Sequence, residues 1–266
     1  LADAKALEAN GIIAKGERLY AEVHTAEAER EYLAAQKTAA TLNSALCNTL
    51  NTETTYQPIS SMFILSQIED VDHFKQLALN NNPQLRQVGL KKDLAVEGVR
   101  LQRADFAPQV ALMGGASFYN YQVTPLMPRW AVGAGVSFKI FDGLNREYKF
   151  SAAKSQVRQV EALNVKAQHD ILTLIDKLYN EMTTYNEQLP SIDAAYNFAA
   201  EYLRIKEEAF KEGAAPSSDV VDAQLNLAKI KTERLQAAYY YDLMLARLLE
   251  ACGESEMLTE YARRPA

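Results

Sequence analysis

The sequence has 266 residues and a net charge of −6 at pH 7, and it is long enough to bury the core of one large domain or two ordinary ones. The negative charge and the absence of a Lys/Arg cluster argue against a nucleic-acid surface, so we expect no nucleic-acid partner. No stretch approaches the roughly 20 apolar residues that a membrane-spanning helix needs.

The first part of the chain predicts helices. Residues 17–50 are rich in Ala and Glu and contain neither Pro nor Gly, which favours one long helix. The polar stretch 51–67 follows as a linker. We then expect helical structure over 70–106, with a short first helix that ends at the run of asparagines before Pro83.

A β-hairpin is predicted at 108–141. Residues 108–121 have an extended pattern, and within the stretch 130–142, WAVGAGVSFKIFD, residues 131–140 alternate between two faces. One face of this second strand is small or polar, and the other is an apolar stripe that includes Val132, Val136, Phe138 and Ile140. Alternation by itself fits either a half-buried hairpin packed on helices or a strand with one face toward lipid.

The remaining sequence predicts two long helices. In the helix over 144–212, apolar residues from Ile171 to Leu203 follow one another at spacings of four and three, which is typical of a coiled-coil seam. A turn at 213–218 leads into a helix over 219–252, whose seam has one polar interruption at Arg234. Residues 254–266 form a tail. The fold class is therefore mainly α, with long antiparallel coiled-coil helices and one inserted β-hairpin.

The two ends of the chain resemble each other. Shifted forward by 202 positions, residues 11–46 fall on 213–248, and Gly11 aligns with Gly213. An acidic residue stands six positions after each glycine, Glu17 in one case and Asp219 in the other. We infer an internal duplication, with residues 1–50 closing a first repeat and 68–253 forming a second.

The first repeat is short at its start. Extending the same shift implies that about 135 residues are missing before Leu1. We therefore expect the chain to be a fragment of a protein with a second hairpin and two further helices.

Four stretches, in this order and spacing, resemble the TolC-type outer-membrane efflux channel family. They are ALNNNPQL at 78–85, FAPQV at 106–110, FKIFDGLNR at 138–146 and GAAPSSDVVDAQ at 213–224.

This resemblance implies a homotrimer in which each repeat adds one hairpin to a shared transmembrane β-barrel and helices to an α-barrel. It implies a passive exit duct in the bacterial outer membrane with a periplasmic extension. The expected partners are outer-membrane lipid, a periplasmic adaptor protein and an inner-membrane pump. The apolar strand face, with Val132, Val136, Phe138 and Ile140, would meet lipid.

The resemblance also assigns roles to the turns. Asp219 and Asp222 match positions where the family places rings of acidic residues at the periplasmic entrance, where carboxylates attract cations. The structural alternative is that Asp219 is a helix N-cap and Asp222 a first-turn acid, and the two interpretations are compatible. The adaptor-docking tips would comprise Gly11, Glu17, Gly213 and Ser217.

Catalysis has little support in the sequence. There is no Gly-rich phosphate loop, nucleophile motif or metal-ligand spacing, so we expect no enzyme activity, no cofactor and no metal. Cys47 and Cys252 are interpreted as small apolar residues, with a disulfide as the alternative. The alternative functions are a periplasmic adaptor and a soluble coiled-coil scaffold.

Overall fold

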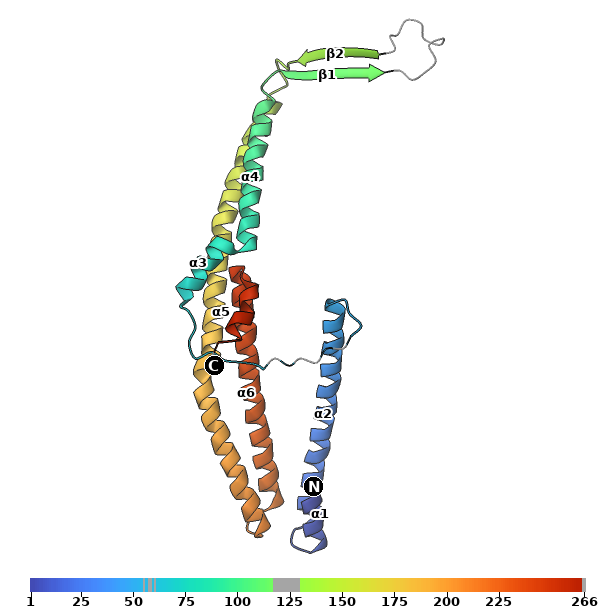
Figure 1. Ribbon diagram of the computed structural model, residues 1–266, viewed down its shortest axis with the longest axis vertical. Helices are drawn as coiled ribbons and strands as arrows, with labels where there is room; N and C mark the ends of the chain where they lie inside the picture. Colours follow the sequence, from blue (N-terminus) through green and yellow to red (C-terminus); the bar gives the residue numbers. More distant parts are fainter. Residues whose placement is uncertain (55, 57–58, 60, 117–129, 265–266) are drawn as a thin grey trace, which may run out of the picture. The chain divides into compact units, whose positions relative to one another are not determined.

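The computed structural model describes residues 1–54, 56, 59, 61–116 and 130–264. It confirms a mainly α fold with one antiparallel hairpin, as Figure 1 shows. The loop between the predicted strands, including the end of the extended stretch 108–121, lies outside the described residues.

The chain divides into two compact units. The first comprises residues 1–69, 177–249 and 255–266, and the second comprises 70–176 and 250–254. This division cuts across the two sequence repeats, because the longest helices contribute to both units.

The first unit is built from long helices. It contains α1 (Ala2–Ala9), α2 (Lys15–Thr49) and most of α6 (Ser217–Cys252). It also contains the later part of α5 (Asn145–Lys211), a helix of 67 residues that continues through Pro190. Its core includes Leu178 and Met182 on α5, and the residues Tyr241, Met244, Leu245 and Leu248 on α6.

The end of the chain adds to this core. A short 3₁₀ helix (Ser255–Met257) and α7 (Leu258–Tyr261) follow α6, so residues 254–264 contain helical turns where the sequence predicted only a tail. Tyr261 is buried, and its hydroxyl donates a hydrogen bond to Glu69 over 2.8 Å. Arg264 forms an ion pair with the same carboxylate at 2.8 Å.

The second unit contains a packed junction at the run of asparagines. Asn82 caps α4 (Pro83–Ala104) by accepting a hydrogen bond from the Leu85 N–H, and Pro83 occupies the first turn. Its amide also donates to the Ala251 carbonyl over 2.7 Å, and Asn82 is only 4% exposed. The preceding helix α3 (Val71–Asn81) buries Phe74, whose carbonyl lies 3.3 Å from the Cys252 thiol. The ALNNNP motif therefore has a structural role: it holds α3 and α4 against the end of α6.

The hairpin pairs β1 (Gln109–Ala116) with β2 (Trp130–Ser137) from Gln109 opposite Ser137 to Ala116 opposite Trp130. Opposite residues share a face, so Val110 and Leu112 join Val132 and Val136 on one apolar face. Nearly every residue of both strands is exposed.

Phe138 and Ile140 were expected within the strand, and this expectation is wrong. β2 ends at Ser137, opposite Gln109. The residue that would continue the ladder from Gln109 is Pro108, which has no N–H to donate. Phe138 and Ile140 lie beyond the strand, and both are exposed.

Candidate functional site: the two helical tips

The two tips have the same backbone design. Gly11, between α1 and α2, has φ +71°, and Gly213, between α5 and α6, has φ +73°. At the first tip Gly11 N–H donates to Glu8 O and Ile12 N–H to Leu7 O. At the second, Gly213 N–H donates to Phe210 O and Ala214 N–H to Ala209 O. Each donor and acceptor of the second tip lies 202 positions after its counterpart in the first tip, which is the shift found in the sequence. This correspondence supports the duplication.

The paired hydrogen bonds identify the turn type. A bond from the glycine N–H together with one from the next N–H to an earlier carbonyl is the Schellman ending of a helix, which needs a residue with positive φ. Glycine adopts this conformation without the steric penalty of a side chain. The local backbone therefore favours glycine at both positions.

The starts of α2 and α6 touch each other. Ser217 N–H donates to a Glu17 carboxylate oxygen over 3.0 Å, and the Ser217 hydroxyl donates to the Glu17 carbonyl over 3.3 Å. One turn further on, the Tyr20 hydroxyl donates to Asp222 Oδ1 over 2.8 Å. Ser217 is buried at this contact, so its hydroxyl faces α2.

Asp219 and Asp222 lie in the first two turns of α6, but in different environments. α6 begins at Ser217, so Asp219 is a first-turn acid and the alternative N-cap assignment is wrong. Its carboxylate binds Lys206 Nζ at 2.6 Å, across the turn. Asp222 is exposed and receives only the Tyr20 hydroxyl. The second carboxylate is therefore the one whose charge has no cationic partner among the described residues.

These contacts also affect their partners. The hydrogen bond to Asp219 raises the pKa of Lys206, and the hydrogen bond to Asp222 raises the pKa of Tyr20. Lys206 was not predicted as a site residue. The signal was available, because Lys206 and Asp219 lie at nearly equal distances before and after Gly213, where antiparallel helices face each other.

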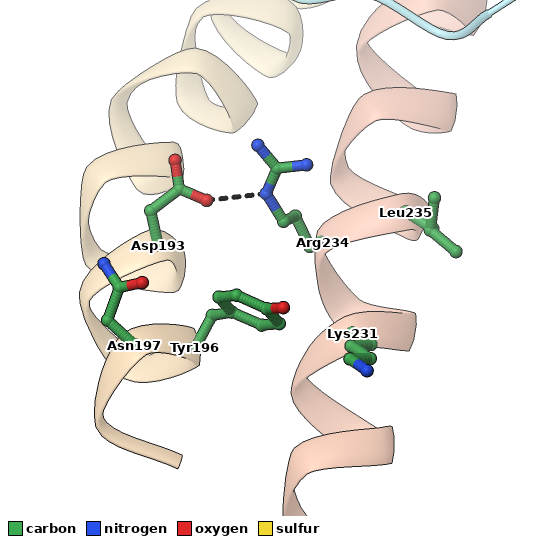
Figure 2. Close-up of a pocket in the computed structure, with 6 residues that line it drawn as sticks. All are labelled: Asp193, Tyr196, Asn197, Lys231, Arg234 and Leu235. Atoms are coloured by element: carbon green, nitrogen blue, oxygen red, sulfur yellow. Dashed lines mark hydrogen bonds and ion pairs between the residues drawn. The ribbon is translucent and has the colours of Figure 1, made fainter. Parts of the chain in front are cut away.

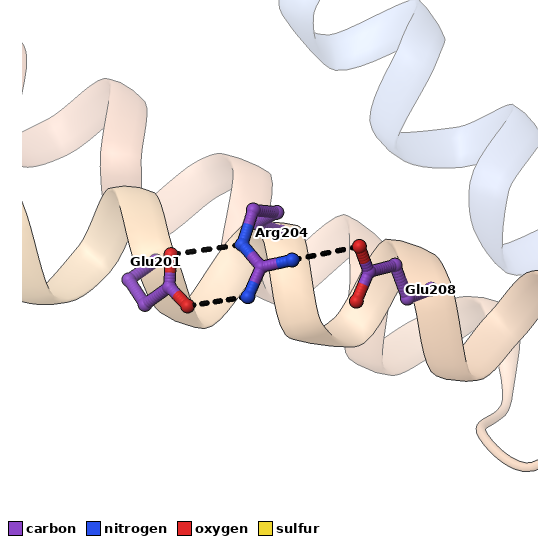
Figure 3. A network of polar contacts seen from close by, with 3 residues as sticks. All are labelled: Glu201, Arg204 and Glu208. Carbon is purple, nitrogen blue, oxygen red and sulfur yellow. Dashed lines mark hydrogen bonds and ion pairs between the residues drawn. The ribbon is translucent and has the colours of Figure 1, made fainter.

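A second cationic group near this tip is also paired. Figure 3 shows Arg204 between Glu201 and Glu208 on α5. Two guanidinium nitrogens donate to Glu201 over 2.6 and 2.9 Å, and a third donates to Glu208 over 2.7 Å. The hydrogen bond from Arg204 lowers the pKa of Glu201. All three residues lie on one exposed helix face, so this network supports α5 alone.

Further from the tip, a polar pair interrupts the seam between α5 and α6. Figure 2 shows Arg234 Nε donating to Asp193 Oδ1, over 2.6 Å, beside Tyr196. The six residues of α6 from 231 to 236 are all exposed, and a cavity of about 540 Å³ opens beside the pair. The predicted interruption at Arg234 is thus a bridge between helices where apolar packing is absent.

The described part of the chain contains no cluster of metal ligands, and its two cysteines are unpaired. No group of three or more His, Cys, Asp and Glu residues there could hold a metal ion. Cys47 and Cys252 are both free thiols, and burial raises the pKa of Cys252 to about 12. The disulfide alternative stays a prediction that the structure does not test. None of the described helices is long and apolar enough to cross a membrane.

Comparison with known proteins decides the family. The model of the outer membrane efflux protein family matches residues 75–254, which is more than half of the chain. The chain belongs to the outer membrane efflux protein family. That family consists of channel proteins of the bacterial outer membrane with a periplasmic extension, which is the location we expected.

Individual relatives agree with this assignment. The chain is 24% identical over 173 residues to the outer membrane protein TolC of Vibrio cholerae, and the match covers 64% of this chain but 39% of that protein. The chain therefore spans well under two thirds of this relative.

Solved structures share the fold. The outer membrane protein VceC of Vibrio cholerae has a TM-score of 0.75 at 19% identity, with 94% of this chain and 61% of that chain covered. The MtrE outer membrane channel of Neisseria gonorrhoeae has a TM-score of 0.75 at 16% identity, with 94% and 59% covered. At these identities the likeness concerns the fold alone.

Proposed function

We propose that this chain is part of a subunit of a trimeric exit duct that spans the outer membrane and the periplasm. The duct conducts small molecules passively as the outer part of a tripartite efflux or secretion system. It has no catalytic step of its own. The observation that supports this most is the family match over residues 75–254, which contains both the hairpin and the second tip.

The hairpin supports the membrane part of the proposal. Its apolar face, with Val110, Leu112, Val132 and Val136, is exposed, and two strands by themselves cannot satisfy their outer edges in lipid. Hairpins from neighbouring subunits would supply the missing edges in a closed barrel. Phe138 and Ile140 would then lie beyond the lipid-facing strand, on the side that leads into α5.

The tips support the periplasmic part. We assign the Gly11 and Gly213 turns to adaptor docking. The Glu17–Ser217 contact between the starts of α2 and α6 would hold the two turns together. We assign Asp222, with Asp219, to the entrance. In a three-fold assembly each carboxylate becomes a ring of three, and the ring of Asp222 carries the unpaired charge.

A conductance experiment tests the entrance. We would purify the protein from its native membrane, confirm a trimer by native mass spectrometry, and record currents in planar bilayers. Asp222→Asn is expected to weaken cation selectivity and block by multivalent cations more than Asp219→Asn does, because Asp219 is already paired with Lys206.

The control is Asp170→Asn, which removes an exposed carboxylate from the same helix that carries Lys206, but within an i,i+4 pair with Lys166. It is expected to leave selectivity unchanged. Equal cation selectivity in all three variants and the native protein would contradict the role of Asp222 and Asp219 at the entrance. A monomer that forms no pore would contradict the proposed duct.

A further inference from the structure

The segment that joins the two repeats lies against α6. We call residues 61–69 the strap. It has no regular secondary structure, yet its Leu65 side chain is 1% exposed. The Phe63 ring contacts the Tyr241 ring edge to face, with centroids 6.4 Å apart. Burial of Leu65 and the ring contact favour docking of the strap.

The surface beneath the strap contains an unusual polar group. Asp242 accepts a hydrogen bond from the Phe63 N–H at 3.3 Å through Oδ2, while its Oδ1 is buried without a hydrogen-bond partner. The neighbouring Tyr241 hydroxyl is also buried, and it lies beside the Leu65 backbone. A half-buried carboxylate with one buried, unpartnered oxygen and one long hydrogen bond is poorly compensated when it is ionised.

The charges around this contact do not compensate Asp242. In the described part of the chain no ion pair reaches it. The ionisable groups nearby are Tyr241 on α6, Tyr179 on α5, Glu69 in the strap, and Tyr261 and Arg264 in the C-terminal segment. Arg264 is engaged with Glu69. Burial therefore dominates and raises the pKa of Asp242 to about 6.

We propose that the strap is a proton-controlled latch: it is held on α6 while Asp242 is protonated, and it is released more readily once Asp242 is ionised. Protonation removes the unfavourable burial of charge and converts Oδ1 or Oδ2 into a hydroxyl. Ionisation makes exposure of the carboxylate to water favourable, and exposure requires the strap to lift. This inference is independent of the proposed duct function.

The direction of the pH effect follows from linkage. The pKa of Asp242 is about 6 in the docked state, against the ordinary 3.8 in a released, hydrated state. The docked state therefore binds the proton more tightly, and its stabilisation is complete below about pH 4 and is lost as the pH rises through about 6.

Glu69 does not share this window. Its burial acts to raise its pKa, but hydrogen bonds from its own backbone, Tyr261 and Arg264 lower it overall. A lowered carboxyl pKa affects stability only below the ordinary value of 4.5. The effect of Glu69 therefore lies below roughly pH 5, the lower pH at which the effect of Asp242 is tested.

Hydrogen exchange of the whole 266-residue chain tests the latch. After correction for intrinsic exchange, amides of the strap are expected to exchange about tenfold faster at roughly pH 7.5 than at roughly pH 5. Asp242→Asn keeps the shape and removes the charge, and it should abolish this dependence. Glu53→Gln, an exposed acid preceding the strap, should retain it.

A second measurement does not depend on the variant folding. Carbon chemical shifts of the Asp242 carboxyl in the unmodified chain should titrate near pH 6, in step with the exchange of the strap amides. A flat exchange profile in the unmodified chain would overturn the latch. So would an unchanged profile in Asp242→Asn, or a carboxyl that titrates near pH 4.

Discussion

In the described part of the chain three helices end at a glycine with positive φ, and the surroundings of these glycines differ sharply. A Cβ at Gly11 or Gly213 would have no atom within 4 Å. A Cβ at Gly253 would lie 2.4 Å from the Asn81 carbonyl oxygen. The backbone requirement is the same in all three, but only Gly253 is also required by packing. The two tip glycines thus have open space around them, whereas the end of α6 is packed against α3.

The largest expected effect separates these two kinds of glycine. Gly253→Ala adds left-handed strain and an overlap with the Asn81 backbone, so we expect it to destabilise the second unit by about 3 kcal/mol or more. Thermal denaturation and hydrogen exchange of α3 measure this. Gly98→Ala in α4 is the matched control, because its Cβ meets nothing and the helix gains about 1 kcal/mol. Equal stability of the two variants would contradict the packing argument.

A smaller effect is expected at the tips. Gly11→Ala and Gly213→Ala each add only backbone strain, which we expect to lower the free energy of unfolding by about 1 kcal/mol. The two losses should be similar, because the hydrogen bonds of the two turns match. Chemical denaturation of each variant tests this similarity. A loss at Gly213 as large as that at Gly253 would mean that the tip is packed after all.

The smallest expected effect concerns the contact between the tips. Tyr20→Phe removes the hydrogen bond to Asp222 and keeps the ring. Because the hydroxyl is exposed, we expect an unchanged denaturation midpoint but faster amide exchange at the start of α6. Tyr32→Phe, also exposed on α2, provides the control. An unchanged exchange pattern in Tyr20→Phe would indicate that the Glu17–Ser217 contact holds the tips by itself.

The two tips also show how a duplicated backbone acquires different charges. In the first, Arg18 binds Glu8 at 2.6 Å and Glu22 on its own helix. In the second, Lys206 binds Asp219. The positions that align with Lys206 and Asp219 in the first tip hold Ala4 and Glu17, so the duplication preserves the turn but not the ion pair.

The sequence predicted most of the local structure of these regions. Glycine, proline and asparagine affect the backbone within a few residues of their own position, so the turns at the two tips and the helix break before Pro83 could be predicted. The extent of α5 could be predicted from the spacing of its apolar residues. The end of β2 was missed, although Pro108 carried the signal, because the ladder depends on which residue stands opposite. The bridge between Asp193 and Arg234 was visible only as a gap in apolar spacing.

By itself the sequence determined the long helices, the hairpin, the duplicated turns and the resemblance to a family, because each depends on short-range spacing. Only the tertiary structure decided which acid is neutralised, which glycine is packed, and that the strap covers Asp242. Those contacts join residues 13 to 179 positions apart. Their partners are selected by the way the chain packs, and no local pattern specifies that choice.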